Sequence, residues 1–181
     1  QHLEMARNFA ERFNHRYGDV FPLPYAFNYG SELIKILSLD GNGKMSKSEN
    51  QMATIYLADT DDAIRKKIMK AKTDSGPQTP GTPKPDYIQN LFNLMQLTGS
   101  AAGVAKFESD YENCVIRYGD MKKQLAEDLV HFISPIRNKA DELKADKNFL
   151  KNILSIGAEK ARINAADTLH QVRKAVGVEY Y

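Results

Sequence analysis

The sequence predicts a mainly α protein, in which the C-terminal edge of an α/β layer is followed by an all-helical segment. Three observations predict this class. Apolar residues recur at three- and four-residue steps over most of the chain. Only residues 33–39 form a run with apolar side chains on both faces, which is typical of a buried parallel strand. A series of further helical patterns follows that run, with no second strand among them.

The first element is a helix that ends near Gly18. Leu3, Phe9, Phe13 and Tyr17 lie on one of its faces. The chain starts at Gln1 and enters this pattern at once, and one helix with one strand cannot bury a parallel sheet on both sides. For both reasons we expect further sequence upstream. A processed or truncated form of a self-sufficient domain is the alternative.

The strand over 33–39 leads into residues 40–50, which contain two glycines and little bulk and predict a mobile, solvated loop. Helices then dominate. We expect one over 60–72 with Thr60 as N-cap, one that Asp86 caps and Gly99 stops, and one that Ser100 caps. Two more are expected from about 120 to 136, with a bend at Pro135, and from about 146 to 176. Residues 73–85 hold four prolines and two glycines, so regular structure is not expected there. Core residues of the helices should include Phe92, Met95, Phe107 and Phe132.

Composition excludes several classes of protein. The 181 residues carry 25 Lys plus Arg against 23 Asp plus Glu, so a polyanion site must be a local cluster and not a bulk property. The single cysteine, Cys114, excludes an internal disulfide framework and a Cys-rich zinc site, and it fits a reducing compartment. The longest apolar run, residues 55–58, is far too short to cross a bilayer.

The stretch most informative about chemistry is Lys44-Met45-Ser46-Lys47-Ser48, which lies in the glycine-flanked loop. Two ammonium groups, two hydroxyls and free backbone N–H groups form a patch of donors suited to a polyphosphate. Fixed or closing cations there would stabilise the charge that develops on a departing pyrophosphate. A solvated basic turn is the alternative. By chance, this string is expected in on the order of one in ten thousand chains of this length, which favours the functional interpretation.

This string resembles the second signature of the class I aminoacyl-tRNA synthetases. Three further stretches narrow the similarity to the bacterial type of tryptophanyl-tRNA synthetase, over the C-terminal half of that family only: residues 2–14, residues 36–39, and Lys70-Ala71-Lys72-Thr73-Asp74-Ser75 before a turn rich in proline and glycine. Tyrosyl-tRNA synthetase is the nearest alternative. The Thr73-Asp74-Ser75 turn, and the lack of a further small RNA-binding domain after the helices, argue against it.

The resemblance implies an enzyme that joins tryptophan to ATP, with Mg²⁺ assisting, and passes the amino acid to tRNA(Trp). Residues 1–58 would be the C-terminal remnant of a Rossmann-like catalytic domain, and residues 59–181 a helical domain that recognises the tRNA anticodon. Lys44 and Lys47 would contact the ATP phosphates, Met45, Ser46 and Ser48 would shape the loop, and Ile36 would lie against the nucleotide. The resemblance implies no metal ligand from the protein, a cytoplasmic location, and a homodimer for the intact enzyme.

One departure from the family is large. Class I enzymes also need a His-x-Gly-His signature, and none of His2, His15, His131 and His170 lies in such an arrangement. The pocket for the tryptophan side chain also belongs to the half that is not in this sequence. We therefore expect the chain by itself to be unable to activate tryptophan.

A third interpretation is a non-catalytic, helical RNA-binding module that carries the loop. Arg65, Lys66, Lys67, Lys70 and Lys72 form a basic cluster that could contact RNA phosphates, or could be a solvated helix face offset by nearby Asp61 and Asp62. A second basic set, which we regard as a weaker candidate, comprises Lys160, Arg162, Arg173 and Lys174.

Overall fold

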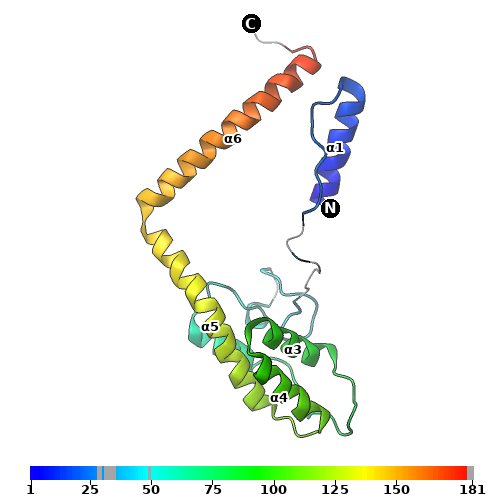
Figure 1. The fold of residues 1–181 in the computed structure, drawn as a ribbon, viewed down its shortest axis with the longest axis vertical. Coiled ribbons are helices and arrows are strands. Elements are labelled where there is room, and N and C mark those ends of the chain that lie inside the picture. Colours follow the sequence, from blue (N-terminus) through cyan, green and yellow to red (C-terminus); the bar gives the residue numbers. More distant parts are fainter. Residues whose placement is uncertain (28–29, 31–35, 49, 179–181) are drawn as a thin grey trace. The chain divides into compact units, whose positions relative to one another are not determined.

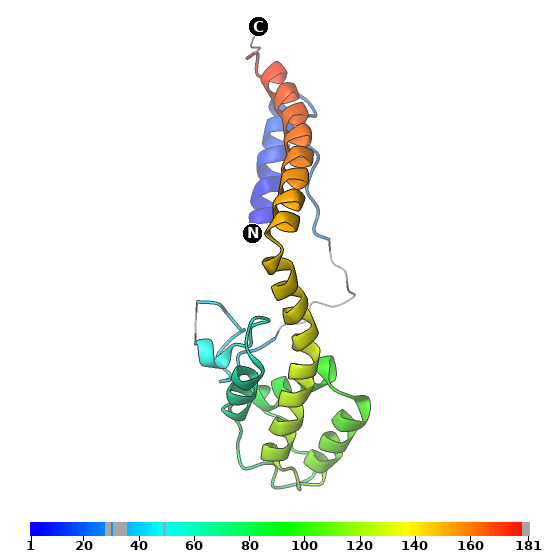
Figure 2. The same ribbon diagram turned by 90° about the vertical axis from the view of Figure 1, so that its left-hand side faces the viewer.

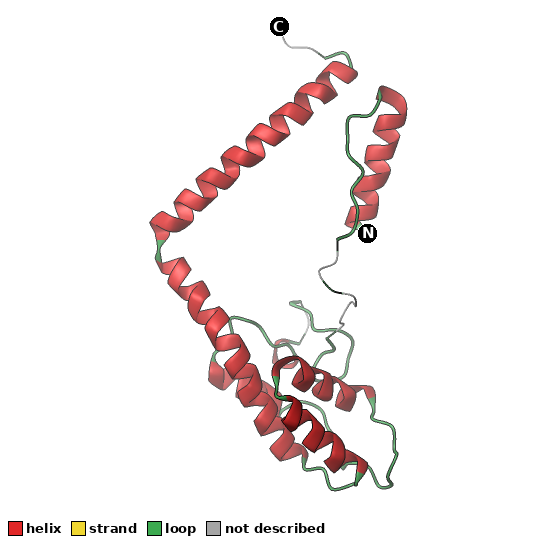
Figure 3. Cartoon of the chain, viewed as in Figure 1, coloured by secondary structure: helices red, strands yellow, loops and turns green. Residues whose placement is uncertain are grey.

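The computed structural model describes residues 1–27, 30, 36–48 and 50–178 of the chain. It forms two compact units. The first comprises Gln1–Leu33 and Leu143–Tyr181, and the second comprises Ile34–Glu142. The described residues form helices and loops, as the colours of Figure 3 show, and no named strand. The mainly α class is thus confirmed.

Helix α1, His2–Tyr17, confirms the first predicted helix. Gly18 ends it with a φ of 91°, a conformation that a residue without a Cβ adopts readily. The side chain of Asn14 then holds the turn, because its Oδ1 accepts hydrogen bonds from the amides of Val20 and Phe21 while its Nδ2 donates to the Phe21 carbonyl at 2.7 Å. The irregular connection that follows is fixed to the helix where the Arg7 guanidinium donates to the Pro24 carbonyl.

Helix α6, Lys147–Ala175, begins where the sequence predicts. Asp146 caps it by accepting a hydrogen bond from the Phe149 amide at 2.8 Å. The apolar residues recur at helical spacing, but no described residue of α6 is buried. No helix among the described residues combines the length and the apolar character that a membrane span requires.

The second unit holds helices α2 (Asp61–Met69), α3 (Asp86–Thr98) and α4 (Ala101–Glu112), the short 3₁₀ helix η1 (Gln51–Ala53), and most of α5 (Tyr118–Ala145). Helices α3 and α4 are in contact, and both views place them beside the first half of α5 (Figures 1 and 2). The core draws on all four α-helices. Its fully buried members are Ile64, Ile68, Ile88, Leu91, Phe92, Met95, Met121 and Leu125. This unit therefore has its own hydrophobic centre.

Most of the predicted helix boundaries in this unit agree with the structure. Thr60 and Ser100 cap α2 and α4 by accepting hydrogen bonds from the Ala63 and Gly103 amides, and residues 73–85 contain no helix. Three predicted ends were wrong: α2 already ends at Met69, Asp86 is the first helical residue of α3 and not its cap, and the helix expected to end near residue 136, α5, continues to Ala145.

The prediction that Phe132 belongs to the core was also wrong, since its side chain is 50% exposed. Helix α5 buries the face that carries Leu125, Leu129 and Ile133. Phe132 lies about 100° around the helix from Ile133, which turns it away from that face. The helix continues through Pro135 to Ala145.

The predicted strand over 33–39 lies partly outside the described residues, which resume at Ile36. What is described there is an isolated antiparallel bridge between Leu37 and Lys44. The edge of an α/β layer therefore stays a prediction. The same holds for the domain boundary between residues 58 and 59.

Candidate functional site

The loop over residues 37–48 folds back on itself at a narrow antiparallel base. The Ser38 amide donates to the Gly43 carbonyl at 2.9 Å, and the Met45 amide donates to the Ile36 carbonyl at 3.1 Å. These two bonds flank Leu37 and Lys44, which form the bridge. Lys44 therefore stands at the base of the loop, opposite Leu37.

The turn between the two bridged segments is held by Asp40. Its carboxylate accepts hydrogen bonds from the Ser38 hydroxyl at 2.8 Å, the Asn42 amide at 3.0 Å and the Asn50 side chain at 3.2 Å. These bonds, chiefly the one from Ser38, lower the pKa of Asp40 below its usual range. The carboxylate thus stays ionised in the folded protein while it organises the turn.

Gly41 and Gly43 supply backbone angles that other residues rarely adopt, with φ values of 79° and 71°. A Cβ on Gly41 would lie 3.1 Å from the Cβ of Tyr87 on α3, whereas a Cβ on Gly43 would meet nothing within 4 Å. Both glycines are needed for the turn, and Gly41 also lets the loop approach α3 closely.

The two lysines of the motif remain accessible to a ligand. The side chains of Lys44, Lys47 and Ser48 are exposed, and Ser46 is half-buried. The Ser46 and Ser48 hydroxyls lie 3.1 Å apart. This arrangement presents ammonium and hydroxyl donors on one short turn, which is the set of groups that a polyphosphate requires.

The side chain of Met45 points toward the hydrophobic core of the second unit, to which the loop also belongs. It packs against the core, and with Ile36 it lines an apolar cavity of about 280 Å³. Further lining residues come from α3 and α5, among them Leu94, Leu129 and Phe132. The structure thus brings Ile36 and Met45 together, as the bridge requires, although Ile36 remains 38% exposed.

The second half of the loop is attached to α2 through Thr54 and Lys67. Thr54 donates its hydroxyl proton to the Ser46 carbonyl at 3.3 Å, and its own carbonyl accepts from the Lys67 ammonium at 2.9 Å. Lys67 also forms an ion pair of 2.6 Å with Asp59. The side chains of this pair are only 8% and 14% exposed, so Lys67 is a structural cation and not part of an open basic face.

The predicted basic cluster over residues 65–72 is therefore divided by the structure, and Lys70 and Lys72 lie beyond the end of α2. Arg65 pairs with Glu127 of α5 through two bonds of 2.7 and 2.9 Å, and Lys67 is buried. Lys66, Lys70 and Lys72 are exposed. These three remain candidates for a contact with RNA phosphates, while the other two hold the unit together.

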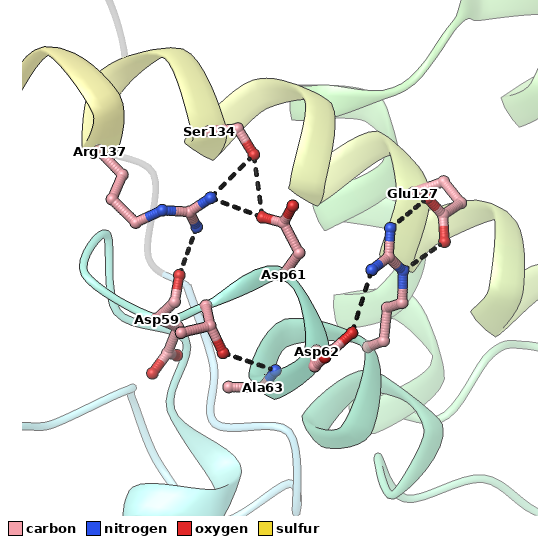
Figure 4. A network of polar contacts seen from close by, with 9 residues as sticks. Asp59, Asp61, Asp62, Ala63, Glu127, Ser134 and Arg137 are labelled. Carbon is pink, nitrogen blue, oxygen red and sulfur yellow. Dashed lines mark hydrogen bonds and ion pairs between the residues drawn. The ribbon is translucent and has the colours of Figure 1, made fainter.

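A polar network joins the N-terminal end of α2 to α5 (Figure 4). The Arg137 guanidinium donates to the Asp61 carboxylate at 2.6 Å and to the Asp59 carbonyl at 2.5 Å, and Ser134 donates to Asp61 at 3.0 Å. These contacts, first of all the bond from Arg137, lower the pKa of Asp61. In the same way Arg65 lowers the pKa of Glu127. Asp61 and Glu127 are thus part of a clamp between α2 and α5.

Two buried polar residues in this region carry no motif signal in the sequence. Asn90, on α3, is 2% exposed, and its side-chain amide pairs with the backbone of Leu37. Lys122, on α5, is 8% exposed and donates to the Ala71 carbonyl at 2.7 Å and the Thr73 hydroxyl at 3.0 Å. Burial lowers the pKa of Lys122. The only sequence sign of either is a polar residue among apolar helix positions.

The described residues contain no group of three His, Cys, Asp or Glu side chains that could hold a metal ion.

The family described as tRNA synthetases class I (W and Y) matches residues 1–134. The chain is 48% identical to a tryptophan–tRNA ligase of Porphyromonas gingivalis, over 98% of this chain and 54% of that protein. It superimposes with a TM-score of 0.76 and 31% identity on a tryptophanyl-tRNA synthetase from Campylobacter jejuni that was crystallised with ADP and tryptophan, over 97% of this chain and 53% of that one.

A tyrosyl-tRNA synthetase from Aeropyrum pernix is less similar, with a TM-score of 0.51 and 25% identity over 84% of this chain and 44% of that one. The tyrosine alternative is thus not favoured, and neither is the non-catalytic module. The chain spans about half the length of the curated relatives it matches.

Proposed function

Because the chain belongs to the class I tRNA synthetases of the tryptophan and tyrosine group, we propose that the protein to which it contributes is a tryptophan–tRNA ligase. That enzyme activates tryptophan with ATP and transfers it to tRNA(Trp). We call residues 37–48 the lysine loop. The observation that carries this proposal is that the lysines of this loop are exposed above the Leu37–Lys44 bridge, in a chain 48% identical to a tryptophan–tRNA ligase.

In the proposed activation step, a carboxylate oxygen of tryptophan attacks the α-phosphorus of ATP. A new bond forms between that oxygen and phosphorus, the bond to the β-phosphate bridging oxygen breaks, and pyrophosphate leaves with the electron pair. Negative charge therefore increases on the leaving group as the reaction proceeds. Lys44 and Lys47, both exposed on the loop, would bind that charge more strongly in the transition state than in bound ATP.

The other motif residues support this task. Ile36 would lie against the nucleotide, Ser46 and Ser48 would donate hydrogen bonds to phosphate oxygens, and Met45 would fix the loop by packing on the core. ATP is the nucleotide, and Mg²⁺ would arrive with it to neutralise its phosphates, with no ligand assigned in this chain. Residues 1–58 would complete the end of a Rossmann-like domain, whose remainder supplies the His-x-Gly-His signature and the tryptophan pocket.

Residues 59–181 would form the tRNA-recognition domain. The exposed residues Lys66, Lys70 and Lys72 support this assignment, since exposed lysines can neutralise phosphates and release counterions. We further propose that the full-length enzyme is a homodimer located in the cytoplasm. The single cysteine of this chain fits the reducing conditions of that compartment.

The test is amino-acid-dependent exchange of pyrophosphate into ATP, performed with the full-length gene product. We expect exchange with tryptophan, none with tyrosine, and charging of tRNA(Trp). A preference for tyrosine would contradict the substrate assignment. The 181-residue chain assayed alone should show no exchange, and measurable turnover by it would show that our division of the active site is wrong.

A further inference from the structure

At the base of the lysine loop, the backbone N–H and C=O groups of Leu37 have no hydrogen-bond partner among the residues of the loop itself, all of which the structure describes. Leu37 and Lys44 form a bridge whose hydrogen bonds come from the neighbouring residues, Ser38 to Gly43 and Met45 to Ile36. In such a pair, the N–H and C=O groups of Leu37 point away from Lys44. They must find partners elsewhere, because an unpaired backbone group away from water is costly.

Asn90 on α3 satisfies both groups. Its Oδ1 accepts a hydrogen bond from the Leu37 amide at 3.1 Å, and its Nδ2 donates to the Leu37 carbonyl at 2.9 Å. The carboxamide thus takes the place that a neighbouring β-strand would occupy, with one donor and one acceptor at the correct spacing. No other natural side chain of this size offers the same pair without a charge.

Asn90 is also placed rigidly. Asn90 is 2% exposed, and its neighbours on the helix, Leu91 and Leu94, are buried in the core of the second unit. The same helix carries Tyr87, whose Cβ faces Gly41 closely enough that a Cβ on the glycine would lie 3.1 Å away. Helix α3 therefore supports both the base of the loop and its turn, and it does so from a packed position.

We propose that Asn90 is a positioning residue for adenylate formation: its amide fixes Leu37, and through the Leu37–Lys44 bridge it fixes where Lys44 and the following turn stand. The inference rests on the proposed function, because it takes the loop lysines as the groups that bind pyrophosphate. Asn90 itself lies 2% exposed beneath the loop and acts only through the backbone of Leu37.

The experiment compares variants of the full-length protein. Asn90→Leu removes both hydrogen bonds at similar volume, and Asn90→Asp retains the acceptor but loses the donor. Asn93→Leu is the matched control, since Asn93 lies on the same helix but is exposed. For each variant we would measure kcat and the KM values for ATP and tryptophan in pyrophosphate exchange, thermal unfolding, and the rate of tryptic cleavage after Lys44 and Lys47.

For both Asn90 variants we expect kcat to fall roughly tenfold to hundredfold, since a misplacement of about 1 Å is enough for such a loss. The KM for tryptophan should stay within about twofold of wild type, because we propose that the tryptophan pocket is formed by the remainder of the Rossmann-like domain. Tryptic cleavage after Lys44 and Lys47 should accelerate, and Asn93→Leu should behave as wild type. A purely structural role would instead lower the temperature of thermal unfolding and the fraction of active enzyme, while kcat per active site, titrated by adenylate formation, would stay at the wild-type value.

Wild-type kinetics and cleavage in a folded Asn90→Leu variant would overturn the inference, and so would equal losses in kcat and tryptophan affinity. If neither Asn90 variant folds, hydrogen exchange of the wild-type protein decides: a Leu37 amide as protected as those of α3 supports the anchor, and exchange at the rate of exposed loop amides refutes it. Failure of the wild-type protein to use tryptophan would refute the proposed function instead, while the cleavage comparison would still test the anchor.

Discussion

Lys67 Nζ lies 2.6 Å from Asp59 Oδ2 and 2.9 Å from the Thr54 carbonyl oxygen, with less than a tenth of the lysine side chain exposed. Thr54 in turn donates to the carbonyl of Ser46 in the lysine motif. One buried ammonium on α2 therefore connects the helical core to the segment that carries the functional loop.

Replacing Lys67 with alanine should destabilise the protein by about 3 kcal/mol, because it leaves the Asp59 carboxylate and the Thr54 carbonyl without their cation. Denaturant unfolding followed by circular dichroism would measure the loss. The matched control is Lys66→Ala, since Lys66 is the exposed neighbour on the same helix and should change stability by less than about 0.5 kcal/mol. Equal effects of the two substitutions would show that the buried ion pair contributes nothing specific.

Gly41→Ala should cost more stability than Gly43→Ala. Both positions have positive φ, so each substitution carries a backbone penalty of roughly 1–2 kcal/mol. Only Gly41 adds a close contact, with the Cβ of Tyr87 at 3.1 Å. Parallel unfolding curves of the two variants test the order, and a larger loss for Gly43→Ala would mean that the approach of the loop to α3 is not as described.

Lys47→Ala in the full-length enzyme should slow adenylate formation about a hundredfold or more, which is a typical cost of removing one group that stabilises transition-state charge. The KM for tryptophan should change much less. The substitution should leave thermal stability unaltered, since Lys47 is exposed. Single-turnover formation of the adenylate is the measurement, with Lys66→Ala as the control. Parallel losses in tryptophan affinity and in rate would contradict a role confined to the transition state.

The clamp between α2 and α5 should weaken in acid. Hydrogen bonding from Arg137 lowers the pKa of Asp61 below its ordinary 3.8, so the folded state binds this proton less readily than the unfolded state does. The contribution of Asp61 to stability is then fully present above that ordinary value and is lost as the pH falls through the lower, folded-state pKa. The hydrogen bond from Arg65 lowers the pKa of Glu127 as well, so the contribution of Glu127 to stability is lost in acid in the same way.

Melting temperatures of wild type and Asp61→Asn, measured from about pH 7 to about pH 2, should therefore differ most at neutral pH and converge in acid. Asp62→Asn is a suitable comparison, because the side chain of Asp62 is 98% exposed and contacts Arg65 at 3.4 Å only. A constant difference for Asp61→Asn over the whole range would exclude the ionised carboxylate as the source of the effect.

The residues that sequence reasoning identified correctly are those whose signal is local. Thr60 and Ser100 cap helices as predicted, because a cap depends on amides only two or three residues away. Helix α6 likewise begins near Asp146 as predicted, and the structure adds that Asp146 is its cap. The lysine motif and its two glycines also stand on a tight turn, for which sequence neighbours are sufficient. Local patterns could not reveal that Leu37 would pair antiparallel with Lys44, since an apolar run is compatible with several partners.

By itself, the sequence determined the mainly helical class, the position of most helices and the presence of the lysine loop, because backbone preferences and helical periodicity act over a few residues. Tertiary structure alone decided which buried polar residues pair with backbone groups far away in the sequence. Asn90 meets Leu37 across 53 positions of the chain, and Lys122 meets Ala71 across 51. It also exposed Phe132 and buried Lys67. Such outcomes depend on which helix faces pack together, and packing is a property of the whole unit that no short stretch of sequence encodes.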